Sequence, residues 1–250
     1  MKNMFKTGHI LSSFEDHDEA MNDITSTQPT SDHAQTVFPT TLEFGNSDHR
    51  SDLARAMRIA ENTVANVGEA MLDRPTPCEH LTVGQLIGHL IFVGQRLEAM
   101  YTGQSDTSLD PWRSAGTSPS EAALALAAQN AIVEELLTQD GMLDRTIVPW
   151  RPMTVRESLP CYVSEFTVHT WDLATATGLA VDWDEDIVAL SQKAMECEIP
   201  ADYRSAIFAA VLADAPDDVE VPFGEAHPAP EGAPSIDQLA AYVGRSLNSQ

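Results

Sequence analysis

Glu165 and His169 place a carboxylate and an imidazole four residues apart in the segment SEFTVHTWDLATATG, residues 164–178. In a helix this spacing puts both side chains on one face, about 6 Å apart along the axis, so that they can converge on one ion. Two ligands are too few for a tight metal site, which therefore needs a third group elsewhere in the chain. Without that group, an acid and a histidine at this spacing are more commonly a surface contact.

His89 is the candidate for the third ligand. It shares a helical face with Leu86, Leu90 and Val93, at a position where an apolar residue is expected. Helical bundles build metal sites from such inward side chains on facing helices. A hydrogen-bonded histidine in the core is the alternative interpretation of this residue.

The three residues together would leave a divalent cation with one net positive charge and open coordination positions, as in catalytic zinc sites. Nickel, manganese and iron accept the same mixture of nitrogen and oxygen ligands. An open position binds either water, for metal-assisted hydrolysis, or a substrate thiol whose pKa the metal lowers. A thiolate adds to activated alkenes and displaces leaving groups. A metal-binding or ligand-binding module without catalytic activity is the third hypothesis.

Four amphipathic segments of bundle length are expected to position these side chains. Helix-start signals precede three of them, at Thr82, at Ser118 followed by Pro119, and at Thr154, and Gly178 is a suitable residue to end the last. Pro160 lies inside the fourth segment, where it either kinks the helix or marks a late start. The segments are residues 52–71, 83–101, 121–137 and 155–177.

The pattern predicts an all-α fold: a four-helix bundle with a small helical C-terminal extension and a disordered N-terminal tail. We expect residues 1–49 to be a flexible acidic tail, 50–180 the metal-binding bundle, and 181–250 an extension packed on it. Residues 142–153 contain two prolines and are predicted to be a short extended connection.

Composition excludes several classes of function. Thirty-eight acidic residues against 14 basic ones give a net charge of −24, which repels nucleic acid. No apolar run is long enough to span a membrane. Three scattered cysteines without a CxxC pair favour a reducing cytoplasm over a disulfide framework. The sequence leaves the oligomeric state open between monomer and homodimer.

Three segments resemble motifs of the DinB-like, mycothiol-dependent maleylpyruvate isomerase N-terminal family: RPTPCEHLTVGQLIGHL, LDRTIVPWRPMTVRESL and EFTVHTWDLATATG. A fourth, PFGEAHPAPEGAPSIDQLAAYVGR, resembles the usual tail of the family's actinobacterial "metal-binding protein" branch. The resemblance implies a DinB-like bundle with a divalent metal, typically zinc, held by His89, Glu165 and His169. It also implies a thiol S-transferase or a thiol-dependent isomerase, with mycothiol or a similar low-molecular-weight thiol and a small electrophile as its partners.

The chain departs from the family pattern near the expected mouth of the site, which puts the substrate in doubt. Leu81 replaces the usual Trp, and His80 stands beside it. Trp150 and Arg151 stand where Phe and Gly are common. Arg145, Arg151 and His80 are the candidate catalytic residues, the two arginines as partners for a substrate carboxylate. The alternatives are a loop histidine and two surface ion pairs of small energetic value.

Two further residues on the predicted ligand helix are considered. Asp172 is assigned a role in supporting a ligand or in capping the helix. Cys161 lies four residues before Glu165 and shares its face. A buried, inert thiol is the first interpretation of Cys161, with a fourth ligand or a reactive thiol as the alternative.

Overall fold

The computed structural model describes residues 47–78, 81–104, 118–148, 152–212 and 223–247. The fold is all-α, as predicted: within these ranges the chain forms seven α-helices and one small two-stranded sheet. None of the described helices combines the length and apolarity needed to cross a lipid bilayer. The predicted N-terminal tail, apart from residues 47–49, lies outside the described residues.

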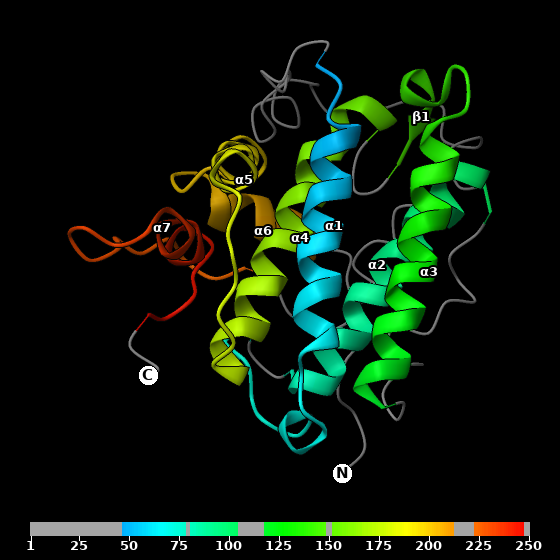
Figure 1. Cartoon of the computed structure of the whole chain (residues 1–250). Coiled ribbons are helices and arrows are strands. Elements are labelled where there is room, and N and C mark those ends of the chain that lie inside the picture. The colour runs from blue at the N-terminus through cyan, green and yellow to red at the C-terminus, as the bar shows by residue number, and fades with distance from the viewer. Residues whose placement is uncertain (1–46, 79–80, 105–117, 149–151, 213–222, 248–250) are drawn as a thin grey trace.

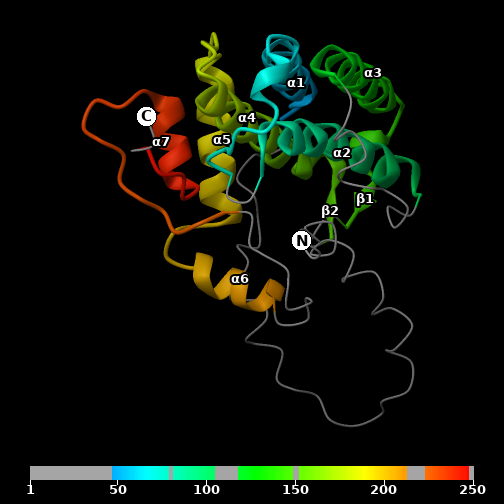
Figure 2. The ribbon, with the colours of Figure 1, turned by 90° about the horizontal axis from the view of Figure 1, so that it is seen from below.

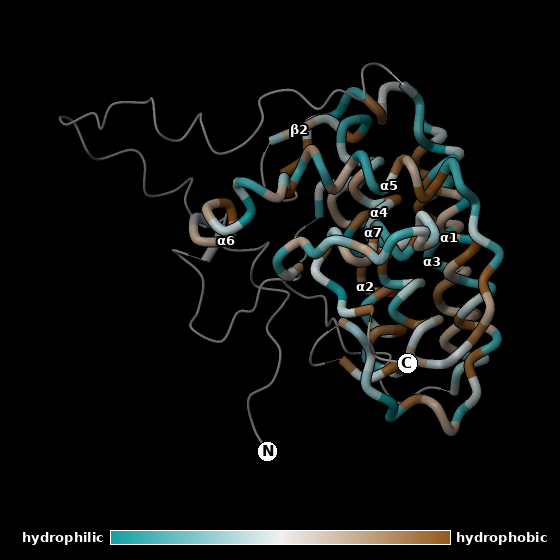
Figure 3. Tube along the Cα trace, turned by 90° about the vertical axis from the view of Figure 1, so that its left-hand side faces the viewer, coloured by the Kyte–Doolittle hydropathy of each residue, from teal (hydrophilic) through white to brown (hydrophobic). Residues whose placement is uncertain are grey.

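Four long helices form the bundle: α1 (Arg50–Ala65), α2 (Val83–Thr102), α3 (Pro119–Leu137) and α4 (Val155–Thr177). Helix α1 packs against α3 and α4, and α2 packs against the same two helices (Figure 1). Apolar and polar residues are interspersed along these helices (Figure 3). Each helix thus has an apolar face, which packs toward the core. The fully buried core residues include Leu53, Met57, Leu86, Leu90, Leu97, Leu126, Leu159 and Phe166.

The start signals in the sequence act as predicted. Thr82, Ser118 and Thr154 each accept a hydrogen bond from the backbone three residues later, and the residue at that position bonds back. Such reciprocal caps satisfy backbone N–H groups that the first turn leaves without partners. Gly178 ends α4 in the left-handed conformation with φ 72°, and Pro160 lies inside a helix that runs on past it.

The first helix is shorter than predicted. It ends at Ala65, and after the extended residue Gly68 a separate 3-10 helix, η3 (Glu69–Met71), continues the segment. The apolar period persists across this break, which is why the sequence alone extended the helix to residue 71.

The predicted extended connection forms a small sheet. Strand β1 (Thr146–Ile147) pairs with β2 (Met153–Thr154) in antiparallel fashion, with Thr146 opposite Thr154. A second 3-10 helix, η4 (Met142–Asp144), precedes it. The sheet thus leads the chain from α3 to the first residue of α4.

The C-terminal residues cover the outer side of α4. Helix α5 (Glu185–Glu198) packs along α4, and α7 (Ser235–Tyr242) packs against both. Both are seen end-on beside α4 in Figure 1, whereas α6 (Arg204–Leu212) lies apart from the bundle in Figure 2. A second apolar cluster joins Val168 and Trp171 of α4 to side chains of α5 and α7.

Candidate metal centre

The structure brings the three predicted ligands together between α2 and α4. His89 Nε2 lies 3.0 Å from Glu165 Oε1, and His169 Nε2 lies 3.3 Å from the same oxygen. The two imidazole rings meet edge to face, with 4.8 Å between their centroids. The helical spacing of Glu165 and His169 and the inward position of His89 therefore produce the convergence that the sequence predicted.

The donor atoms fit a small divalent cation. One atom from each of the three residues lies within 4.8 Å of the other two. Tetrahedral zinc with bonds of about 2.1 Å needs donors about 3.4 Å apart, close to the two measured separations. His169 is 3% exposed, whereas the side chains of His89 and Glu165 are 17% and 25% exposed. The cluster is therefore open to solvent on the side of His89 and Glu165.

The three side chains of the cluster shift one another's pKa values. Burial opposes the charged form of His169, but the Glu165 charge and hydrogen bonds with Asp172, Cys78 and Glu165 raise its pKa well above the usual value. Burial also opposes ionisation of Glu165, yet His169 and His89 hold the pKa of its carboxyl far below the usual range. Burial lowers the pKa of His89. The ionised form of Glu165 and the protonated form of His169 thus favour each other.

Asp172 faces the other nitrogen of His169. Its Oδ2 accepts a hydrogen bond from His169 Nδ1 at 3.1 Å, and Arg245 Nε donates to its Oδ1 at 2.9 Å. Burial raises the pKa of Asp172, but the Arg245 charge and the His169 hydrogen bond outweigh it, so the carboxyl remains ionised. An acceptor at Nδ1 keeps the proton there and turns the Nε2 lone pair toward the other ligands. This is the supporting contact that the sequence suggested for Asp172.

Cys78 is a neighbour of the site that sequence reasoning missed. One ligand atom each of Cys78, His169 and Asp172 lies within 4.8 Å of the others, which forms a second candidate cluster. Asp172 is already paired with Arg245, and the positive charge of Arg245 disfavours the binding of a cation by the second cluster. The signal for Cys78 was its place in the TPC motif. Cys161, considered instead, is buried in α4 and belongs to neither cluster.

The predicted catalytic residues are not assembled at the cluster in the part of the chain that is described. Arg145 is exposed, and its guanidinium donates to the carbonyl of Tyr101. Tyr101 lies 12 residues beyond His89 on α2, about 18 Å along the helix axis. His80 and Arg151 lie outside the described residues. Arg96, which the sequence analysis did not consider, is 3% exposed, and its charge contributes to the lowered pKa of His89.

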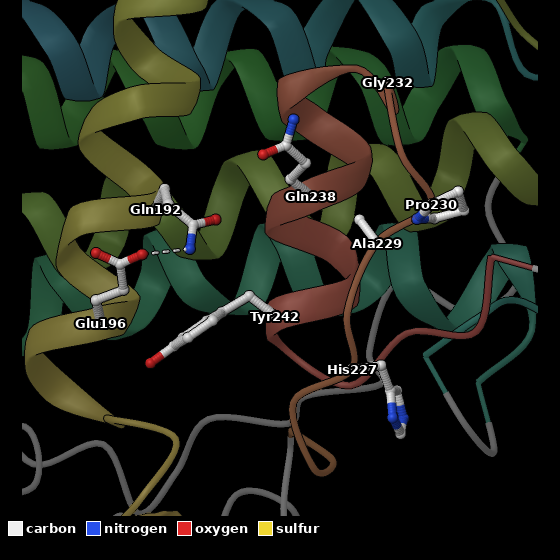
Figure 4. A pocket seen from close by; sticks show the side chains of 8 residues that line it. All are labelled: Gln192, Glu196, His227, Ala229, Pro230, Gly232, Gln238 and Tyr242. Carbon is white, nitrogen blue, oxygen red and sulfur yellow. Dashed lines mark hydrogen bonds between the residues drawn. The ribbon is translucent and has the colours of Figure 1, made fainter.

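A surface hollow of about 410 Å³ lies elsewhere, between α5, α7 and the segment before α7. Gln192 and Glu196 of α5 face Gln238 and Tyr242 of α7 across it (Figure 4). None of the three predicted ligands lines it, so the hollow is separate from the candidate metal centre.

Comparison with known proteins agrees with the motifs. Residues 53–174 match the family model of the mycothiol maleylpyruvate isomerase N-terminal domain, a range that includes all three predicted ligands. Two relatives from strains of Mycobacterium tuberculosis, the uncharacterized proteins Rv0738 and MT0763, are 25% identical over 194 residues, which cover 77% of this chain and 95% of each relative. No solved structure gives a significant match. Residues 53–174 are therefore similar to the mycothiol maleylpyruvate isomerase N-terminal domain family.

Proposed function

We propose that the protein is a divalent-metal-dependent enzyme that uses a low-molecular-weight thiol of the mycothiol type on a small electrophilic substrate. It either transfers the thiol or uses it to isomerise the substrate. The observation that supports this proposal best is the convergence of His89, Glu165 and His169 inside a domain similar to this family. Zinc is the metal that the donor set favours.

Each ligand has a distinct task in this proposal. His89 and His169 offer neutral Nε2 atoms, and Glu165 offers the one negative charge. A bound cation would supply a Lewis acid that lowers the pKa of a coordinated thiol. Asp172 keeps the His169 proton on Nδ1, so that Nε2 is free to bind. The open side at His89 and Glu165 is where thiol and substrate enter.

The bonds formed and broken in the proposed reaction balance. The thiol loses its proton, and its sulfur forms a bond to an electrophilic carbon of the substrate. In transfer, a leaving group departs from that carbon with the bonding electrons. In isomerisation, the new C–S bond breaks again after rotation about the former double bond.

Hydrolysis has less support from the geometry. It needs a carboxylate or imidazole beside the cation to remove a proton from water. Among the described residues, Asp172 is the additional carboxylate next to the cluster, and both of its oxygens are bonded, to His169 and Arg245.

The three cysteines are free thiols, which suits a reducing compartment where a small thiol substrate stays reduced.

Metal analysis combined with a panel of thiols tests the proposal. The purified protein is expected to bind about one zinc per chain and to consume a model electrophile only with a suitable thiol. His169→Ala should lose both properties. His227→Ala is the matched control, because His227 lines the separate hollow and should retain both. Metal-free wild-type protein, or thiol turnover that survives His169→Ala, would refute the proposal.

A further inference from the structure

We propose that Arg245 is a positioning residue of the metal centre, through which the C-terminal extension sets the affinity for the metal. This inference rests on the proposed metal site but not on the thiol chemistry. Arg245 lies 71 residues beyond the matched family domain, which ends at residue 174. It acts through Asp172 on His169 and touches none of the reacting atoms.

The contacts form one continuous chain of hydrogen bonds. Arg245 Nε donates to Asp172 Oδ1 at 2.9 Å, and Arg245 Nη2 donates to Oδ2 at 3.1 Å. The same Oδ2 accepts from His169 Nδ1 at 3.1 Å. The three residues are 5%, 0% and 3% exposed, so water does not substitute for any of these bonds. One carboxylate therefore separates the guanidinium from a metal-binding imidazole.

The geometry requires an arginine at this position. If His169 were its only partner, the Asp172 carboxylate could rotate about its side-chain bonds. The imidazole of His169 would then lose its fixed orientation. The planar guanidinium engages both oxygens and so fixes the carboxylate plane, which an ammonium group on a flexible stem cannot do. Partners of metal ligands of this kind are typically worth about 10–100-fold in metal affinity.

The extension holds Arg245 where this contact needs it. Gly244, the preceding residue, has φ +87°, and a Cβ there would lie 2.5 Å from the Cα of Gly224. The chain therefore passes so close to Gly224 that only glycine fits. Asp237 of α7 accepts a hydrogen bond from Trp171 Nε1 of α4 at 2.8 Å. The part of the extension from α7 to Arg245 is thus hydrogen-bonded to the ligand helix at two adjacent residues, Trp171 and Asp172.

Of these two contacts, only Arg245–Asp172 is connected to a candidate metal ligand, His169. This difference provides a control. Arg245→Met removes the contact with Asp172 and keeps most of the apolar side chain. Asp237→Ala removes the contact with Trp171 and leaves Arg245, Asp172 and His169 unchanged. Both variants weaken the attachment of the extension, so a merely structural role predicts the same effect on metal binding for both.

The experiment is a titration of the full-length, metal-free protein with zinc in competition with a chromophoric chelator, followed by visible spectra of the cobalt form. Arg245→Met should lower zinc affinity at least tenfold and shift the cobalt bands, because the imidazole changes orientation. Arg245→Lys should regain only part of the affinity. Asp237→Ala should bind zinc within twofold of wild type, with an unchanged cobalt spectrum.

A double variant decides whether Arg245 acts through Asp172. Arg245→Met added to Asp172→Asn should weaken zinc binding by less than twofold beyond Asp172→Asn alone. Wild-type affinity and spectrum in folded Arg245→Met, or in Arg245→Lys where the methionine variant does not fold, would overturn the inference. So would equal losses in Arg245→Met and Asp237→Ala. Wild-type protein that binds zinc without thiol activity would refute the proposed reaction and leave this inference intact.

Discussion

His169 is the side chain on which the candidate site depends, because its two nitrogens face two different carboxylates. Nε2 lies beside Glu165 and Nδ1 beside Asp172. The first contact belongs to the predicted metal site, and the second determines which nitrogen presents a lone pair to it. The imidazole therefore transmits the state of the buried Asp172–Arg245 pair to the open side of the cluster.

Metal affinity is expected to fall as the pH is lowered. The pKa of His169 is raised in the metal-free protein, so below that pKa a proton occupies Nε2 and must leave before a metal binds. Each pH unit below the pKa should weaken binding about tenfold, because one proton is released. Zinc competition titrations between pH 5.5 and pH 8 measure the slope. Equal affinity throughout this range would show that His169 is not a ligand.

Asp172→Asn is expected to destabilise the protein by about 3–5 kcal/mol at pH 7, because it leaves the Arg245 charge buried without its counter-charge. The pKa of Asp172 is lowered by folding, so its carboxylate stabilises the folded state above the unfolded pKa, and this contribution is lost as pH falls. The difference between variant and wild type should therefore persist down to about pH 4 and shrink only below it, as pH falls toward the lowered folded pKa. Urea unfolding of metal-free protein at about pH 7, pH 4 and pH 3 measures it.

Asp144→Asn is the matched control for that comparison. Asp144 also pairs with an arginine, Arg156, but its side chain is 76% exposed. An exposed pair of this kind contributes about 0–1 kcal/mol. Equal losses from the two substitutions would contradict the assignment of Asp172 to a buried, charge-compensated site.

The convergence of the three candidate ligands could be predicted from the sequence for a physical reason. Helical periodicity relates residues four apart on one helix, and it marks a histidine that interrupts an apolar face. Cys78 reaches His169 from a loop, and Arg245 reaches Asp172 from the C-terminal segment. No local period relates such segments to α4, so only tertiary packing reveals their proximity.

At the scale of elements, the bundle helices are predicted well because their ends carry chemical signals. Thr82, Ser118 and Thr154 are side-chain caps, and each starts its helix where expected. The end of α1 has no comparable signal and was placed six residues too late. Caps are local interactions, so the sequence reveals them. Where the apolar spacing continues on both sides of a helix end, as after α1, the position of that end depends on tertiary packing.

Gly94 lies in close contact with α3, and Gly94→Ala is expected to cost about 1–3 kcal/mol of stability through overpacking. An added Cβ would lie 2.7 Å from Gln129 Cγ. Gln129 cannot move away freely, because its Nε2 donates to Glu98 at 2.7 Å. Thermal or urea unfolding measures the loss.

Gly84→Ala provides the control for Gly94. Gly84 is in the same helix, but its added Cβ would have 3.4 Å to the nearest atom, an ordinary contact. Alanine is also the better helix former, so this variant should be neutral or slightly stabilising. A stable Gly94→Ala protein would mean that α2 and α3 are further apart than described.

At the scale of the whole molecule, the dominant property is charge. The chain has 38 acidic residues and 14 basic ones. The excess negative charges repel one another more strongly in the compact folded state than in the unfolded chain. Exposed ion pairs such as Arg50–Asp48 and Arg58–Glu134 oppose this repulsion. Each contributes at most about 1 kcal/mol, and basic residues are too few to pair with most of the acids.

Added salt is therefore expected to stabilise the protein. Raising ionic strength from 0.01 M to 1 M shortens the screening length from about 30 Å to about 3 Å, which removes long-range repulsion together with the weak surface pairs. Because repulsion involves the larger number of charges, the free energy of unfolding should rise, by an amount on the order of 1 kcal/mol or more. Urea unfolding in sodium chloride and in choline chloride should give the same increase, since screening depends on ionic strength. A midpoint that falls with both salts would show that attractive pairs, and not the excess of acids, dominate the electrostatics of the fold.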